Sequence, residues 1–157
     1  LLIAGQALQS GREAIYQTQM QDINPTSAAQ VEWLGYVQPV DLPALYARST
    51  CAIFPSAATP LLQAKCSVKL ATTLLHGVPV IASAVGEQAA YGANGAANLV
   101  AADATAAAFA HATAELVKQP LRQQQLINDA KQHLLSTYPW PRLGKDLVAF
   151  YQQVSQP

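Results

Sequence analysis

Short, wholly apolar segments alternate along the chain with longer segments in which apolar residues recur at helical spacing. Each apolar segment has the length of a buried strand, since strands usually contain about three to ten residues. We predict strands at residues 1–4, 31–37, 51–55, 78–83 and 97–100. We predict helices at residues 11–20, 42–49, 68–76, 106–118 and 121–135, and a last one striped by Leu143, Leu147 and Phe150.

This order of elements predicts the fold class. Strands that are apolar throughout are typical of a parallel sheet covered by helices on both faces. Right-handed crossovers between such strands make the fold α/β and Rossmann-like, and the succession of helices after the last strand predicts an all-helical C-terminal end. The length fits one domain over residues 1–157, with a kinked connector and a terminal helix at 138–157.

Several residues mark the predicted helix ends. Asp41 precedes one helix as a cap, and Ser67 is a good N-cap for the helix at 68–76. Gly77 is a good stop for that helix because glycine readily adopts the left-handed conformation found after helix ends. Either Asp103 or Thr105 caps the helix that begins at residue 106.

Composition narrows the class of partner. Hydrophobic residues make up 51% of the chain, which is ample for a core, and charged residues only 11% with zero net charge. This balance gives no electrostatic reason to expect nucleic acid or an anionic membrane as the main partner. No apolar run approaches the roughly 20 residues of a membrane span. Cys51 and Cys66 have no metal-binding or redox spacing, so we interpret them as free thiols of a cytosolic protein.

The first residues suggest a longer protein. The sequence opens directly with an apolar strand, and neither a methionine, a polar lead-in nor a signal peptide precedes it. We therefore expect the chain to be a fragment whose missing part holds some of the chemistry.

Candidate chemistry is expected in the loops that follow the strands, because ligands of such sheets bind outside the carboxyl ends of the strands. The helix that begins near Ser67 offers unpaired N–H groups and a partial positive charge, which suit a diphosphate. Lys69 lies in the first turn of that helix, where a cation opposes the helix dipole. An anion bound nearby would explain this lysine, and a solvated surface lysine is the alternative.

Other candidates are less specific. Gly86 would let the backbone approach a ligand closely, or it is an ordinary turn glycine. Tyr36 and Val37 end a predicted strand, where Tyr36 could pack on a flat base or belong to the core. Glu87 is interpreted as a solvated loop charge. The three histidines, His76, His111 and His133, lack the spacing of metal ligands.

Four segments in this order resemble a known family: LLIAG, VEWLGYVQPVDLPALYARSTCAIFPS, KLATTLLHGVPVIASAVGE and STYPWPRLGKDLVAFY. They are similar to the C-terminal, nucleotide-sugar-binding half of retaining glycosyltransferases with the GT-B fold, in the family 4-like or group 1 set. The resemblance runs nearly from end to end. Each segment alone is weakly specific, and their order and spacing together are more so.

The resemblance implies a set of nucleotide-sugar-binding residues. The base would lie near Tyr36 and Val37, and the diphosphate at the start of the helix near Ser67, with Lys69 on the phosphates. The complete implied set is Gly5, Tyr36, Val37, Ser56, Ser67, Val68, Lys69, Thr72 and Gly86.

The resemblance also implies the partners. A nucleotide sugar would be the donor substrate, with no cofactor and no metal, since no acidic cluster is present to hold one. The missing N-terminal half would bind an acceptor that the sequence does not identify, either a polysaccharide such as one of the cell envelope, a lipid or a small molecule. It would also carry any peripheral contact with the inner face of the membrane, in a cytoplasmic protein.

The chain departs from the family at three positions. The common pair of glutamates eight positions apart corresponds to Ala64 and Thr72, and the glutamate often found in the glycine loop corresponds to Ala90. We expect the isolated fragment to be inactive. Three interpretations stay open: the donor-binding domain of a glycosyltransferase, a diverged non-catalytic nucleotide-binding or scaffold module, and a sugar-nucleotide epimerase of the same architecture.

Overall fold

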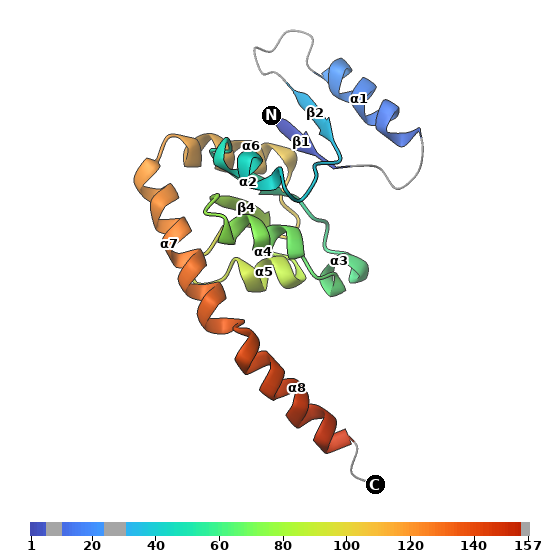
Figure 1. Cartoon of the computed structure of the whole chain (residues 1–157). Coiled ribbons are helices and arrows are strands. Elements are labelled where there is room, and N and C mark those ends of the chain that lie inside the picture. The colour runs from blue at the N-terminus through green and yellow to red at the C-terminus, as the bar shows by residue number, and fades with distance from the viewer. Residues whose placement is uncertain (6–10, 24–30, 155–157) are drawn as a thin grey trace. The chain divides into compact units, whose positions relative to one another are not determined.

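A computed structural model of the chain describes residues 1–5, 11–23 and 31–154. It divides into two compact units, Leu1–Leu45 and Tyr46–Pro157. The placement of the chain's parts relative to one another is not determined (Figure 1). Every strand pairing in either unit is parallel, and helices connect the strands, which confirms the expected α/β class.

The first unit contains one parallel strand pair. Its elements are β1 (Leu2–Ala4), α1 (Arg12–Ile23), β2 (Glu32–Gly35) and most of α2 (Leu42–Ala47). Ile3 aligns with Trp33, and the register then shifts so that Ala4 aligns with Gly35. The Gly5 amide donates to the Gly35 carbonyl at 2.7 Å, which extends the pairing just beyond both strands.

The second unit contains a sheet of three parallel strands in the order β3-β4-β5. Helices of this unit connect and follow the strands, and the last three form the helical end that the sequence predicts. Its elements are β3 (Ala52–Phe54), α3 (Pro60–Ala64), α4 (Val68–Leu75), β4 (Val80–Ser83), α5 (Gly86–Tyr91), β5 (Asn98–Val100), α6 (Ala106–Val117), α7 (Pro120–Thr137) and α8 (Trp140–Val154).

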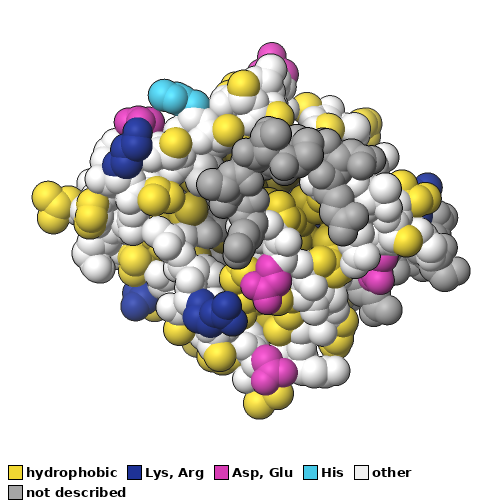
Figure 2. All heavy atoms as spheres, turned by 90° about the horizontal axis from the view of Figure 1, so that it is seen from above, with side chains coloured by type: hydrophobic (Ala, Val, Ile, Leu, Met, Phe, Trp, Pro, Cys, Tyr) yellow, Lys and Arg dark blue, Asp and Glu magenta, His cyan; other side chains and the backbone are white. Residues whose placement is uncertain are grey.

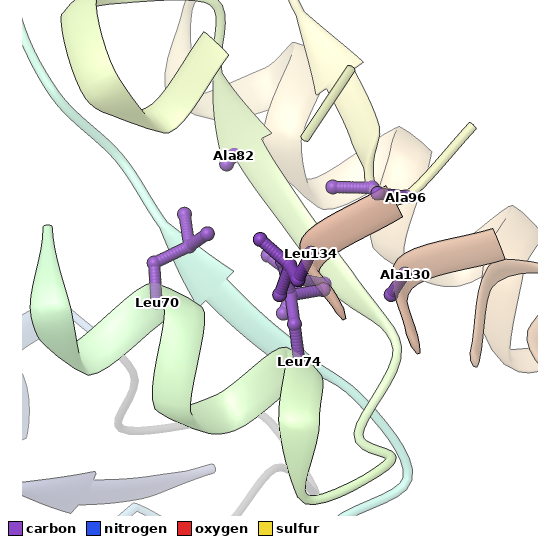
Figure 3. Packing of buried hydrophobic residues seen from close by; sticks show 8 residues of the cluster. Leu70, Leu74, Ala82, Ala96, Ala130 and Leu134 are labelled. Atoms are coloured by element: carbon purple, nitrogen blue, oxygen red, sulfur yellow. The ribbon is translucent and has the colours of Figure 1, made fainter. Parts of the chain in front are cut away.

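The central strand β4 is buried along its whole length and divides the core into two layers. Val80 and Ala82 face the cluster that contains Leu70 and Leu74 of α4. Figure 3 shows Leu74 meeting Leu134 of α7 in this cluster. Alternate strand residues point to opposite faces, so one face of β4 is covered by α4 and the end of α7.

The opposite face of β4 is covered by α6 and by an earlier part of α7. Ile81 belongs to a second cluster with Phe109 and Leu116 of α6 and with Leu126 from the beginning of α7. Helix α7 therefore contributes to both clusters, with Leu126 to one and Leu134 to the other. Within this unit, the expectation of helices on both faces of a parallel sheet is confirmed.

The structure corrects three details of the sequence prediction and decides between the two caps that it left open for α6. The segment after β3 contains α3, and the glycine loop after β4 contains α5, where we expected loops. Thr105 rather than Asp103 caps α6, because its hydroxyl accepts from the Ala108 amide at 3.3 Å. The connector before the last helix is only Tyr138–Pro139, since α8 already begins at Trp140. Pro141 is tolerated there because a helix's first turn has no use for its missing N–H.

The last two helices follow each other directly, and they form the orange and red end of the ribbon (Figure 1). Helix α7 has a buried stripe, whereas α8 buries none of its side chains against the described residues. Its apolar side chains are exposed, from Trp140 at 84% to Leu143 at 38%. Helix α8 is therefore amphipathic with an uncovered apolar face.

Charged side chains are sparse on the surface. On the face seen in Figure 2, the two signs are interspersed among hydrophobic side chains of the described residues. This is the surface expected of a chain with 11% charged residues and zero net charge.

Candidate functional site

The carboxyl ends of β3 and β4 lie next to each other because the two strands are parallel neighbours. Ser56 follows β3, and its backbone amide donates to the hydroxyl of Ser83, the buried last residue of β4, at 2.9 Å. The Ser56 hydroxyl in turn accepts from the Gln88 side-chain amide of α5 at 2.8 Å. Three segments therefore meet at one end of this sheet, which is the end where ligands of parallel sheets bind.

Helix α4 is the second helix after β3 in the chain, and the side chain at its N-cap position does not cap its first turn. Ser67 occupies the N-cap position as predicted, but its side chain makes no capping hydrogen bond, so the expected side-chain cap is wrong. The first N–H groups of a helix have no partner within the helix, and an anion can satisfy them. Val68 and Lys69, the next two residues, are both exposed.

Lys69 is the cation of this first turn. The ion pairs found among the described residues join Lys118 to Glu115 and Arg142 to Asp146, and neither involves Lys69. A lysine at this position is unfavourable for the helix dipole and gains no carboxylate partner there in return. The arrangement is suited to an anion, which would satisfy both the lysine and the open N–H groups.

The backbone of α3 lies directly against Gly86, the first residue of α5. Gly86 opens α5 with φ of +48°, and the backbone of Gln63 fills the space that a side chain at position 86 would need. The close backbone approach predicted at Gly86 is thus made by the chain's own α3. Thr59 accepts from the Leu62 amide at 3.3 Å and caps α3, with Pro60 at its first position.

The side chains of Cys66, Tyr91 and Tyr138 form a separate group between the start of α4 and the junction of α7 with α8. The Cys66 thiol is 3.6 Å from the Tyr91 hydroxyl, and the Tyr91 and Tyr138 rings meet edge to face at 5.2 Å. The hydrogen bond with Cys66, burial and the nearby Glu87 together raise the pKa of Tyr91. Burial and then the negative charge of Glu87 raise the pKa of Tyr138.

His133 holds the end of α7 against α5. Its Nε2 lies 2.8 Å from the Ala90 carbonyl, and its Nδ1 lies within hydrogen-bond distance of Asn94 and Thr137. The imidazole is buried, and each of its ring nitrogens lies within hydrogen-bond distance of one of these neighbours.

The positions where the family commonly has glutamates carry no acid here. Ala64 ends α3 and is exposed, and Thr72 is half-buried on α4. The Thr72 carbonyl accepts from the His76 amide and lies 2.8 Å from His76 Nδ1. Ala90 is half-buried on α5.

Three predicted site residues belong to the first unit. Gly5 and Gly35 are joined by a hydrogen bond just beyond β1 and β2, so Gly5 and Tyr36 lie at the same ends of paired strands. The Tyr36 side chain is 61% exposed, which contradicts a core role for this ring, whereas Val37 is half-buried. The six other predicted residues, all in the second unit, are Ser56, Ser67, Val68, Lys69, Thr72 and Gly86.

Gln88, Ser83 and helix α3 belong to this end of the sheet, and none of the three was predicted from the sequence as part of it. The pair Thr59-Pro60 is a signal that could have revealed α3, because it places an N-cap residue before a proline at the first helical position. Gln88 carries no comparable signal, since its partner Ser56 is 32 positions away.

The described residues contain no group of three or more His, Cys, Asp or Glu side chains placed to hold a metal ion. Over the same residues, no helix is both long and apolar enough to cross a membrane.

Comparison with solved structures identifies the fold. Sucrose-phosphate synthase (tll1590) from Thermosynechococcus elongatus matches with a TM-score of 0.74 and 21% identity over 98% of this chain. Anabaena Alr3699/HepE, in a crystal structure with UDP-glucose, matches with a TM-score of 0.75 and 15% identity over 97% of this chain. The chain covers only 38% and 40% of those two proteins. None of the curated proteins is a significant match.

One family model matches more than half of the sequence. The model described as "Glycosyl transferases group 1" matches residues 1–119, which extend from β1 through α6 and include every predicted site residue. The family expected from the sequence and the α/β fold of a GT-B half are both confirmed. This chain therefore belongs to the group 1 family of glycosyl transferases.

Proposed function

We propose that the chain is the donor-binding part of a glycosyltransferase that moves a sugar from a nucleotide diphosphate sugar to an acceptor. The family match over residues 1–119 carries this proposal. One structural neighbour, the Anabaena HepE protein, was crystallised with UDP-glucose, which is a donor of this chemical class. The acceptor would be bound by residues outside this chain.

The start of α4 is the proposed diphosphate site. Its N-cap makes no side-chain hydrogen bond, and Lys69 is exposed in the first turn. Open N–H groups and an ammonium group stabilise negative charge on the phosphates. Because negative charge grows on the diphosphate as the sugar leaves, the same groups would assist transfer.

Thr72 favours a second candidate function. It stands where the family commonly has a glutamate that hydrogen-bonds the ribose, and Ala64 and Ala90 replace two further glutamates. A chain that lacks these acids could bind a nucleotide without transferring a sugar. This second candidate is a non-catalytic nucleotide-binding or scaffold module.

Nucleotide titration tests the diphosphate site. The protein at its natural full length is titrated with UDP-, GDP- and ADP-sugars, alongside Lys69→Ala and the matched control Lys131→Ala, which removes an exposed lysine of α7. We expect Lys69→Ala to weaken binding by about tenfold or more, the range for hydrogen bonds to charged groups. Lys131→Ala should bind as the unaltered protein does.

The outcomes separate the two candidates. Sugar transfer or donor hydrolysis by the full-length protein supports the transferase, whereas binding without either supports the module. Failure to bind any of the nucleotides would contradict the transferase and a nucleotide-binding module, and would leave only a scaffold module. Equal affinity in Lys69→Ala and the unaltered protein would remove the phosphate role of Lys69 and leave the family assignment intact.

A further inference from the structure

A chain of hydrogen bonds holds Ser56 from two sides. Its backbone amide donates to the buried Ser83 hydroxyl at 2.9 Å, which fixes the backbone just after β3. Its own hydroxyl oxygen accepts from Gln88 Nε2 at 2.8 Å, which fixes the side chain. Ser56 itself is half-buried, so part of its surface remains accessible at the carboxyl end of the sheet. It is a restrained hydroxyl at the end of the sheet where ligands bind.

The direction of the Gln88 hydrogen bond determines what Ser56 can offer. A serine hydroxyl has one proton to donate and two lone pairs to accept with. Gln88 donates to one lone pair, so the Ser56 proton remains available to an acceptor outside the protein. If the amide were turned, its carbonyl would take that proton instead, and Ser56 would have none to donate.

The oxygen of the Gln88 side-chain amide lacks the hydrogen bond that a buried acceptor usually has. Gln88 Oε1 is buried and has no hydrogen-bond partner among the described residues. A buried acceptor without a partner is unfavourable, so such an atom calls for an explanation. Orientation of a neighbouring hydroxyl toward a ligand provides one.

We propose that Gln88 is a positioning residue, which holds the Ser56 hydroxyl as a hydrogen-bond donor to an oxygen of the bound nucleotide's diphosphate. Phosphate oxygens are strong acceptors and cannot donate when ionised, so the site is productive only when the Gln88 amide donates to Ser56. The proposal rests on the proposed nucleotide-binding function. It adds a specific role for Gln88, and it makes Ser56 rather than Ser67 the serine side chain that contacts the diphosphate.

A double-mutant cycle tests the coupling between the two residues. Gln88→Met keeps the length of the side chain and removes its hydrogen bonds without adding charge. The full-length protein, Gln88→Met, Ser56→Ala and the double variant are titrated with UDP, GDP and ADP. Gln125→Met on α7 is the matched control because Gln125 is exposed. Thermal unfolding of every variant separates a loss of affinity from a loss of folding.

We expect Gln88→Met and Ser56→Ala each to weaken binding by about two- to tenfold, the range for one hydrogen bond. The double variant should bind no more weakly than Ser56→Ala alone, because Gln88 acts only through Ser56. Gln88→Glu should weaken binding further, since its carboxylate accepts the Ser56 proton. The control should bind like the unaltered protein.

Two results would overturn the positioning role of Gln88, and both can be distinguished from a result in which the proposed nucleotide-binding function itself fails. If the unaltered protein binds and Gln88→Met binds equally well, Gln88 has no positioning role while the nucleotide site stands. If the effects of Gln88→Met and Ser56→Ala simply add, Gln88 does not act through Ser56. If the unaltered protein binds no nucleotide at all, the proposed function fails and this assignment fails with it.

Discussion

Helices α4 and α8 carry the same kind of sequence pattern and have opposite surroundings. Both are amphipathic, with apolar side chains recurring on one face. In α4 that face is buried, with Leu70 and Leu74 almost fully inaccessible in the core beside β4. In α8 the corresponding face, with Leu147 and Phe150, is more than half exposed within the described part of the chain.

The difference shows what an amphipathic pattern establishes. The spacing of apolar residues determines which face of a helix avoids water, because side chains three and four positions apart share a face. It does not determine what covers that face. For α4 the cover is β4 and α7 of the same unit.

The largest expected effect contrasts one leucine from each helix. Leu74→Ala should lower the free energy of unfolding by about 2–5 kcal/mol, because it leaves a cavity beside β4. Leu147→Ala should change it by less than about 0.5 kcal/mol, because Leu147 is an exposed side chain. Urea titration followed by circular dichroism measures both variants. A large loss in Leu147→Ala would mean that the apolar face of α8 is covered in solution.

Gly86 and Gly144 show the same difference in surroundings, because the first is packed against another backbone segment and the second has no neighbouring atom. Gly86→Ala should destabilise the second unit by about 1–3 kcal/mol, since its Cβ would overlap the Gln63 backbone. Gly144→Ala in α8 meets no neighbouring atom and should stabilise the helix by about 0.5–1 kcal/mol. Thermal unfolding should show melting temperatures displaced in opposite directions. Displacement of both in the same direction would contradict the assigned surroundings.

The smallest effect concerns the tyrosines near the starts of the two helices. Tyr91 contacts Cys66, shortly before α4, and Tyr138 precedes α8. Both pKa values are raised above the ordinary 10, so the folded state holds these protons more tightly than the unfolded state. This contribution is complete below pH 10 and is lost as the pH rises above it.

We therefore expect the melting temperature to fall between pH 10 and pH 12, and to fall less in Tyr91→Phe, which lacks the titrating hydroxyl. Differential scanning fluorimetry across this range measures the two profiles. Parallel profiles for the two proteins would show that Tyr91 does not contribute to the alkaline loss of stability.

Most of the regular elements could be predicted from local sequence. The apolar runs at β3, β4 and β5 and the stop at Gly77 depend on neighbouring residues, and the structure has them within a few positions of the prediction. Helices α3 and α5 were missed because they have only five and six residues, too short for an apolar repeat to become visible.

The candidate site was less predictable than the fold. Lys69 and Ser67 could be located because both lie at the beginning of a helix whose ends the sequence marks. The Ser83–Ser56–Gln88 hydrogen bonds could not, since Ser56 is 27 positions from Ser83 and 32 from Gln88. Such contacts arise only when the sheet brings distant segments together. The family resemblance supplied the remaining site residues.

The contact between Gly86 and Gln63 has a consequence for how this protein can vary. Because the backbone of α3 occupies the place of a side chain at position 86, only glycine is compatible with a docked α3. A lengthened or shortened segment between β3 and α4 would displace α3 and relax that restriction. In a library of variants of this segment, α3 is still docked against α5 in those variants that accept only glycine at position 86. In variants that also accept a larger residue there, α3 is no longer docked.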